Sequence, residues 1–291
     1  MRQSMENKAH TRIIDGCLQL RSETPYSHDI RIHDLGHGHT EATVMPRYGW
    51  SEVDVLSPQA HADYIDQLLN PPALTPLELL DKVARHREKA TQRAKTSVRR
   101  HIKSKNLNQM ITLTYGENVR DRDTHLRNFD VFVKRVRRLI PSFEYVVTHE
   151  LQERGAWHSH LAVHRILPVY TYKNTLVKSY TLLIHLWRSS HTSRGAVKVS
   201  PIHSKRRSVA FIALYLTKYI GKHLNSDVPK YGNSYSASSG TPPMPMTFRS
   251  LHPELMDAVI DLHGLLGDMG NVRQSGCFLP GDIYYLAASP P

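Results

Sequence analysis

The hydrophobic and polar positions between residues 108 and 224 alternate between the period of a strand and the period of a helix. Alternating, β-rich runs predict four strands, at 109–115, 143–151, 157–164 and 196–202. Apolar residues three and four positions apart predict three helices, in "THLRNFDVFVKRVRRLI", "YKNTLVKSYTLLIHLWR" and "SVAFIALYLTKYIGKHL". The order βαββαβ, followed by a helix, predicts an α+β fold of the split βαβ type. Its central antiparallel sheet has flanking helices packed on one face, and the other face is free for a ligand.

Outside this region the patterns are weaker. Ser57 before Pro58 predicts the start of a short helix, and the capping-box spacing of Thr75 and Glu78 predicts the start of a longer one. The stretch from 225 is rich in Ser, Gly and Pro, which is typical of a flexible linker or flap. The expected segments are an N-terminal extension of unknown function, a basic helix, a folded domain, the linker or flap, and a C-terminal helical segment with a tail, at residues 1–75, 76–107, 108–224, 225–247 and 248–291.

Charge suggests the first partner. The 291 residues include 38 Lys and Arg against 26 Asp and Glu, and the run "KVARHREKATQRAKTSVRRHIKSK" holds much of the excess. Such a concentration of positive charge attracts polyanions, so a nucleic acid is the expected partner, although a solvated helix face is the plain alternative. The candidate DNA-binding residues are Arg85, Arg87, Arg93, Lys95, Arg99 and Arg100 in this run and Arg135 and Arg138 in the next helix.

Composition also disfavours several classes of protein. The two cysteines, Cys17 and Cys277, are too far apart in sequence to suggest a disulfide scaffold or a CxxC metal site. The N-terminal residues lack the apolar core of a signal peptide, and apolar runs fall far short of the roughly 18 residues that span a bilayer. We therefore expect no membrane association and a cytoplasmic location.

The run "GAWHSHLAVH" places histidines on one face of a predicted strand. In an extended chain His158 and His160 point to one side, whereas Ser159 points to the other. His164 is expected to be a hydrogen-bonded neighbour rather than a further ligand. A second histidine-rich run, "HDLGHGHT", lacks the cysteines or helix that would fix a metal-binding spacing.

The turn before this strand sets the register of the pair. A three-residue loop from Glu153 to Gly155 places glycine where positive φ is needed. Glu150 then lies opposite His158, and His149 turns to the other face. Two imidazoles and a carboxylate suit Mg²⁺ or Mn²⁺, and zinc would also accept them. The alternative is an exposed His-x-His pair that binds no metal.

The run "YLTKYIGK" offers candidate nucleophiles. On a helix Tyr215, Tyr219 and Lys222 share one face, and Lys218 lies one step round. A phenol, with a reference pKa of about 10, needs nearby cations or a metal to attack a phosphate at neutral pH. The alternative is that both tyrosines are core residues with solvated hydroxyl groups.

Together, "TLTY", "ERGAWHSH" and "YLTKYIGK" resemble the three motifs of the HUH endonucleases, specifically the two-tyrosine rolling-circle replication initiators of small phages and plasmids. The resemblance implies an antiparallel sheet, a divalent ion, and a tyrosine that nicks single-stranded DNA at a replication origin. The corresponding residues are His158 and His160 as the metal-binding pair, Glu150 as the acidic residue, Tyr215 and Tyr219 as the nucleophiles, and Lys218 and Lys222 as the adjacent lysines. Ser159 departs from the usual hydrophobic residue, which puts packing beneath the sheet in question.

The implied reaction leaves a 5′-phosphotyrosine, a covalent protein–DNA linkage, and a free 3′-OH that primes synthesis. Because no GxxxxGK[ST] motif is present, dependence on a host helicase and polymerase in the bacterial cytoplasm is expected. A two-tyrosine transposase shares this motif order, whereas relaxases usually reverse it. The alternative from another class is a nonenzymatic, basic protein that binds single-stranded nucleic acid.

Overall fold

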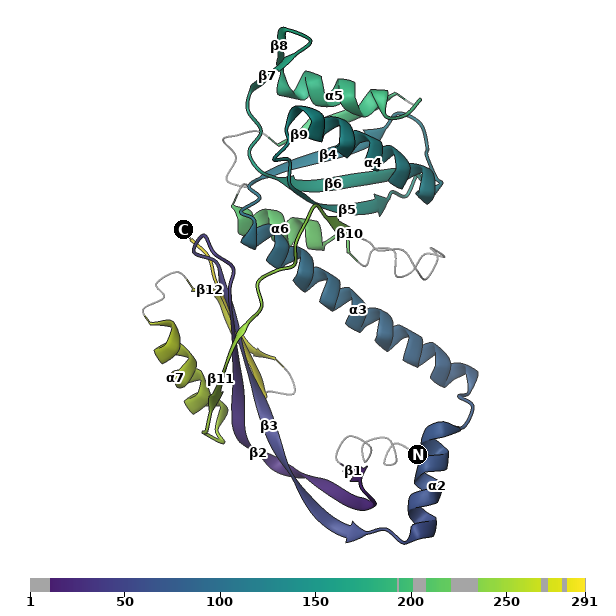
Figure 1. Ribbon diagram of the computed structural model, residues 1–291, viewed down its shortest axis with the longest axis vertical. Helices are drawn as coiled ribbons and strands as arrows, with labels where there is room; N and C mark the ends of the chain where they lie inside the picture. Colours follow the sequence, from purple (N-terminus) through teal and green to yellow (C-terminus); the bar gives the residue numbers. More distant parts are fainter. Residues whose placement is uncertain are drawn as a thin grey trace. The chain divides into compact units, whose positions relative to one another are not determined.

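The computed structural model describes residues 11–192, 194–200, 208–220, 235–267, 272–278 and 282–290. The chain divides into two compact units (Figure 1). The first comprises residues 1–34, 38–82 and 243–291, and the second comprises residues 35–37 and 83–242. The long helix α3 (Pro76–Ser104) therefore contributes residues to both units.

The second unit contains a five-stranded antiparallel sheet in the order β10-β5-β6-β4-β9. Its strands are β4 (Gln109–Tyr115), β5 (Tyr145–Leu151), β6 (Trp157–Val163), β9 (Gly195–Val199) and β10 (Tyr235–Ala237). The helices along this stretch are α4 (Arg122–Leu139), α5 (Ser179–Ser189) and α6 (Val209–Thr217). The predicted α+β class and the βαββαβ order are confirmed.

Both faces of this sheet are covered by helices, whereas the sequence predicted one free face. Figure 1 shows α4 and α5 on one side and α6 on the other. Phe132, Leu161 and Trp187 belong to the core beneath α4 and α5, and Ala162 and Ile212 to the core beneath α6 and the end of α3. The second cover was missed because the helix at 208–224 was placed by order alone, and its apolar residues need a surface to bury against.

A small hairpin replaces the start of one predicted helix. Strands β7 (Val169–Tyr172) and β8 (Thr175–Lys178) pair with each other, and α5 begins only at Ser179. Lys173 and Asn174 form the turn with φ of 48° and 61°. A two-residue turn with positive φ at both positions suits a tight hairpin, and asparagine tolerates this conformation well.

The first unit is a second antiparallel sheet covered by one helix. Its strands follow the order β1-β2-β3-β13-β12, and β11 pairs with β2. They are β1 (Thr11–Ile14), β2 (Cys17–Asp34), β3 (Thr40–Val55), β11 (Met246–Ser250), β12 (Val272–Phe278) and β13 (Ile283–Ala288). Helix α7 (Leu255–Leu266) packs Ala258 and Leu262 against Ile30 and Val44. Residues 1–75 and 248–291, expected as an extension and a helical tail, thus contribute strands to one sheet.

Two predicted helix starts are confirmed in this unit. Helix α2 (Pro58–Leu69) is capped by Ser57, whose Oγ accepts from the Ala60 amide at 3.2 Å. At α3 the Thr75 amide donates to Glu78 Oε2 at 2.9 Å, and the Glu78 amide donates to Thr75 Oγ1 at 3.3 Å. These are the reciprocal bonds of a capping box.

The described part of the expected linker contains strand residues. Residues 225–234 lie outside the described residues, but Tyr235–Ala237 pair with β5, and β11 begins at Met246. An edge strand offers unpaired backbone groups that an adjoining segment can satisfy whatever its side chains. A composition rich in Ser, Gly and Pro gives no sign of such pairing.

Gly195 marks a close approach that a side chain would disturb. Trp187 Nε1 donates to the Thr114 carbonyl at 2.9 Å, and a Cβ on Gly195 would lie 2.6 Å from that nitrogen and 2.7 Å from that carbonyl oxygen. Gly195→Ala should therefore lower the unfolding temperature, with a loss of about 1–3 kcal/mol, the usual cost of overpacking. Gly264→Ala is the control, because a Cβ there meets nothing within 4 Å. Equal unfolding temperatures of the two variants in thermal scans would contradict the packing of Gly195.

Candidate active site

The turn between β5 and β6 has the predicted three-residue form. The Gln152 amide donates to the Ala156 carbonyl at 2.9 Å, and the Gly155 amide donates to the Gln152 carbonyl at 2.8 Å. Gly155 has φ of 82°, the positive value that glycine adopts without strain. Glu150 consequently lies opposite His158. The predicted register is confirmed.

The imidazole pair and the carboxylate share the face covered by α6. His160 Nε2 lies 3.0 Å from Glu150 Oε2, and His160 Nδ1 lies 3.3 Å from Thr112 Oγ1. Arg154 Nη2 donates to His158 Nε2 at 3.4 Å. Glu150, His158 and His160 are all buried.

The surroundings of His158 keep its ring neutral. Burial, followed by the proximity of His160 and Arg154, lowers the pKa of His158 to about 4. At neutral pH its Nε2 therefore carries a lone pair, which accepts from Arg154. A neutral imidazole nitrogen is the form that binds a metal ion.

The two tyrosines lie beside His160. The Tyr219 ring stacks on the His160 ring, with centroids 3.9 Å apart and an angle of 8° between the planes. The Tyr219 hydroxyl donates to the Tyr215 hydroxyl at 2.5 Å. The structure thus brings together the predicted histidines, the carboxylate and both candidate nucleophiles.

The helix that carries the tyrosines is shorter than predicted. Helix α6 ends at Thr217, and Tyr219 lies in the following turn, where its amide donates to the Leu216 carbonyl at 3.2 Å. The Lys218 ammonium lies 5.8 Å from the centre of the Tyr215 ring. Lys222 lies outside the described residues.

Burial makes the two tyrosines unequal. The pKa of Tyr219 is raised, first by burial and then by its hydrogen bond with Tyr215. Tyr219 is only 9% exposed, whereas Tyr215 is partly exposed. Protein groups alone therefore hold Tyr219 in its protonated form, and the charge that would reverse this has to come from a cation.

The donor atoms have the right chemistry for a divalent cation but are not yet gathered around one point. Within the described residues, no three His, Cys, Asp or Glu side chains are arranged to hold a metal ion together. The reason is local, because Glu150 and His160 Nε2 contact each other directly. Two imidazoles and one carboxylate on a shared face still match the donor set of a divalent site.

Ser159 has polar partners on the reverse face of the sheet. Its Oγ lies 2.9 Å from His149 Nδ1 and 3.0 Å from His125 Nε2, and His125 Nδ1 lies 3.1 Å from the Tyr115 hydroxyl. This buried hydroxyl is therefore satisfied where a hydrophobic residue was expected. His149 faces this side as predicted, but the contribution of His125 was missed because it comes from another element, α4.

Arg154 and Thr112 were also missed as site residues. Arg154 belongs to the β5–β6 turn, and its Nη2 also donates to the Tyr115 carbonyl at 3.2 Å. The run "ERGAW" gave a signal, because a turn next to His158 brings its side chains close to it. Thr112 pairs with His160 across β4 and β6, a nonlocal contact that the sequence did not show. His164, expected as a hydrogen-bonded neighbour, contacts Glu144 Oε2 at 3.2 Å.

The predicted DNA-binding residues fall into two groups on opposite faces of the sheet. Arg135 and Arg138 lie on α4, which covers the reverse face. The basic residues of α3 belong to the helix whose end packs with α6 on the histidine face. Arg85, Arg87, Arg93 and Arg138 are exposed, and Lys95, Arg99, Arg100 and Arg135 are partly buried.

Comparison with known proteins gives one match. Residues 108–224 match the family model of the replication-associated protein ORF2, which supports a replication initiator. Neither the curated proteins nor the solved structures contain a match to the chain. No helix within the described residues combines the length and apolar character needed to cross a membrane.

The buried histidines make stability dependent on pH. Burial lowers the pKa of His149 to about 3 and holds that of His125 well below its usual value, whereas unfolded histidine titrates near about 6.5. Between these values the unfolded state binds more protons, so stability is complete above about pH 6.5 and is lost as the pH falls. We expect the free energy of unfolding to decrease between pH 7 and pH 5, by up to about 2 kcal/mol for each histidine.

Urea unfolding at the two pH values measures this loss. Replacing His125, His149 and Ser159 together by apolar residues should flatten the dependence, because the three partners are removed as a set. Replacing His263, which is exposed, should leave it. A urea midpoint of the unaltered protein that is the same at pH 7 and pH 5 would show that these rings protonate freely in the folded state.

Proposed function

We propose that the chain is a metal-dependent endonuclease that nicks single-stranded DNA at a replication origin and starts rolling-circle replication. One observation carries the proposal: the Tyr219 ring stacks on His160, which contacts Glu150, while the Tyr219 hydroxyl contacts the Tyr215 hydroxyl. Two nucleophiles therefore lie beside a candidate metal site. The match of residues 108–224 to a replication-associated family supports the replication role.

In this proposal His158, His160 and Glu150 hold a divalent ion, Mg²⁺ or Mn²⁺. The bound ion supplies a Lewis acid that polarises the scissile phosphate and favours an ionised phenol. Glu150 exchanges its contact with His160 for the ion. The Thr112 hydroxyl beside His160 Nδ1 keeps the ring oriented, as such outer contacts do in metal sites.

Arg154 is proposed to bind the scissile phosphate. Its Nη2 lies 3.4 Å from His158 Nε2, and its Nε donates to Gln152 Oε1 at 3.1 Å, so the guanidinium is held at the edge of the site. No carboxylate among the described residues pairs with it. A planar guanidinium that keeps N–H groups available binds phosphate oxygens in a fixed orientation.

Tyr215 is proposed to attack first. Its oxygen accepts the hydrogen bond from Tyr219, which favours negative charge on the accepting atom, and its side chain is the less buried of the two. The Tyr215 oxygen bonds to phosphorus, the bond to the 3′ oxygen breaks, and the phenol proton ends on the released 3′-OH. The product is a 5′-phosphotyrosine, and Tyr219 serves the later transfer that recloses the strand.

The proposed partners follow from this chemistry. The basic residues of α3 and α4 gather DNA through its phosphates. A host polymerase would extend the 3′-OH and a host helicase would unwind the duplex. A two-tyrosine transposase would use the same site on different DNA, and a nonenzymatic binding protein would form no covalent product.

The order of the tyrosines can be tested with single variants. Incubation with labelled single-stranded origin DNA and Mn²⁺, followed by denaturing electrophoresis, measures the covalent adduct. Tyr215→Phe should reduce the first-turnover adduct by at least about a hundredfold, as loss of a nucleophile does, whereas Tyr219→Phe should retain most of it. Tyr170→Phe, a tyrosine change away from the site, is the control. Full adduct in the Tyr215→Phe, Tyr219→Phe double variant would reject the proposal.

The metal site can be tested without DNA. Isothermal titration with Mn²⁺ alone should show a loss of affinity of about tenfold or more in His160→Asn and in Glu150→Gln, because each removes a proposed ligand. His164→Asn is the matched control, since His164 lies on the same face of the chain but contacts Glu144 instead. Equal Mn²⁺ affinities of His160→Asn and His164→Asn would contradict the assignment of the ligands.

A further inference from the structure

A separate cavity lies at the end of the sheet where β5 begins and β6 ends. Its volume is about 430 Å³, within the range of small-ligand sites. Phe143, Ile166 and Tyr170 are among its apolar and aromatic lining residues, and Glu144, His164 and Arg165 supply most of its polar groups. His164 follows His160 by four residues, roughly 13 Å along an extended chain, so the cavity is distinct from the candidate active site.

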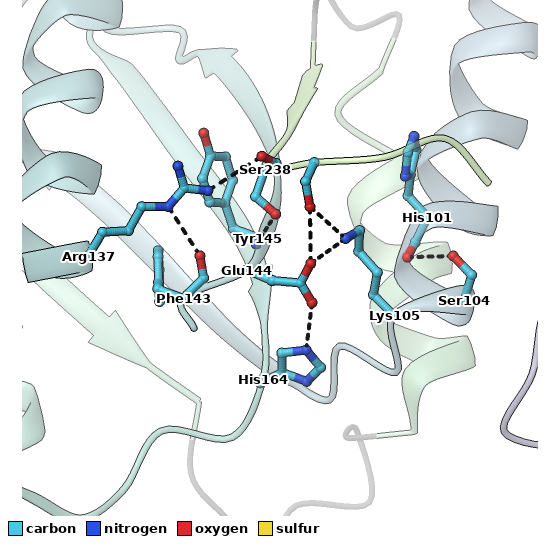
Figure 2. A network of polar contacts seen from close by, with 10 residues as sticks. His101, Ser104, Lys105, Arg137, Phe143, Glu144, Tyr145, His164 and Ser238 are labelled. Carbon is cyan, nitrogen blue, oxygen red and sulfur yellow. Dashed lines mark hydrogen bonds and ion pairs between the residues drawn. The ribbon is translucent and has the colours of Figure 1, made fainter. Parts of the chain in front are cut away.

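A polar network fixes one wall of this cavity (Figure 2). Glu144 Oε1 accepts from Lys105 Nζ at 2.5 Å and from Ser239 Oγ at 3.1 Å. Glu144 Oε2 lies 3.2 Å from His164 Nε2. The hydrogen bond from Lys105 lowers the pKa of Glu144, so the carboxylate is ionised at neutral pH.

This wall presents hydrogen-bond acceptors. An ionised carboxylate only accepts, so His164 Nε2 carries the proton in this contact, and Nδ1 of the neutral ring is an acceptor. Glu144 accepts three hydrogen bonds in the network, whereas a carboxylate has about four acceptor positions. A ligand that places an amino group against this wall therefore finds acceptors already oriented.

The rim of the cavity is positively charged. Arg165 is exposed and has no hydrogen bond or ion pair among the described residues, so its guanidinium is available to an anion. Arg137 lies nearby, with Nε donating to the Phe143 carbonyl at 3.4 Å and Nη2 to the Ser238 carbonyl at 3.4 Å (Figure 2). With Lys105, three cations thus surround the single carboxylate of Glu144.

We propose that this cavity binds one nucleotide of the single-stranded DNA. The base enters among the apolar and aromatic side chains, its amino group faces Glu144 and His164, and its phosphate contacts Arg165. Cytosine, adenine and guanine carry such an amino group and thymine does not, so the cavity discriminates against thymine. The inference rests on single-stranded DNA as the ligand of the proposed function, but not on nicking.

The consequence is a sequence preference away from the scissile bond. The candidate active site and the cavity lie along the same strand, β6, and its direct continuation. A DNA strand held at both places is read at one nucleotide a fixed distance from the bond that is cut.

Fluorescence anisotropy of the full chain with labelled oligodeoxycytidine and oligothymidine of equal length tests the preference. The unaltered protein should bind oligodeoxycytidine about fivefold more tightly, the ratio expected from one additional hydrogen bond. His164→Ala should abolish this ratio, and Arg165→Ala should weaken binding of both oligonucleotides. Both side chains are exposed at the surface, so folding should be retained. Arg127→Ala, which removes an exposed arginine paired with Asp121, should change neither the ratio nor the affinity appreciably.

A ratio of one in the unaltered protein, or an unchanged ratio in His164→Ala, would overturn the inference. Binding of deoxycytidine monophosphate at lower concentration than oligodeoxycytidine would assign the cavity to a free nucleotide and would overturn the assignment to a strand. His164→Ala should still form the covalent adduct at saturating DNA. Loss of adduct in the tyrosine variants with an intact cytidine preference would therefore reject nicking alone and leave the nucleotide site standing.

Discussion

The candidate active site depends on the register between β5 and β6. Side chains alternate between faces along a strand, so a slip of one residue would exchange every group of β6 between the two sides. His158 and His160 would then lie under α4, and Ser159 would face the tyrosines. The turn at Gly155, with φ of 82°, prevents this slip because it closes the hairpin with Glu150 opposite His158. A local backbone conformation thus determines the chemistry of a whole face.

The same alternation places demands on the reverse face. Ser159, His149 and His125 are buried there, and polar groups in such an environment are costly unless they are paired. They contact one another at 2.9 to 3.0 Å, and the network continues to the Tyr115 hydroxyl. Ser159 therefore completes a polar cluster beneath the histidines, and a hydrophobic residue there would leave two imidazoles without one of their partners.

Sequence reasoning succeeded where structure is local and failed where partners are distant. The β5–β6 register follows from a glycine in a short turn and a two-residue period, and both are visible in one short stretch of sequence. The first unit could not be predicted in this way, because β2 pairs with β11 and β3 with β13 across more than 200 positions of the sequence. The placement of α6 also depends on a distant surface, Val146 and Ala162 on the sheet. The position of the two tyrosines beside His160 was therefore beyond a sequence argument, although their spacing was not.

Two tyrosines in one site are useful only if they differ, and the structure supplies the difference. Tyr219 is buried against His160 and donates its proton to the oxygen of Tyr215, so negative charge is disfavoured on Tyr219 and favoured on Tyr215. Once Tyr215 carries a phosphate its oxygen is a weaker acceptor, and the hydrogen bond that restrained Tyr219 is weakened with it. A cation bound at His158 and His160 would then act on the second phenol from the face of the stacked ring. A single hydrogen bond would in this way give the two nucleophiles a fixed order.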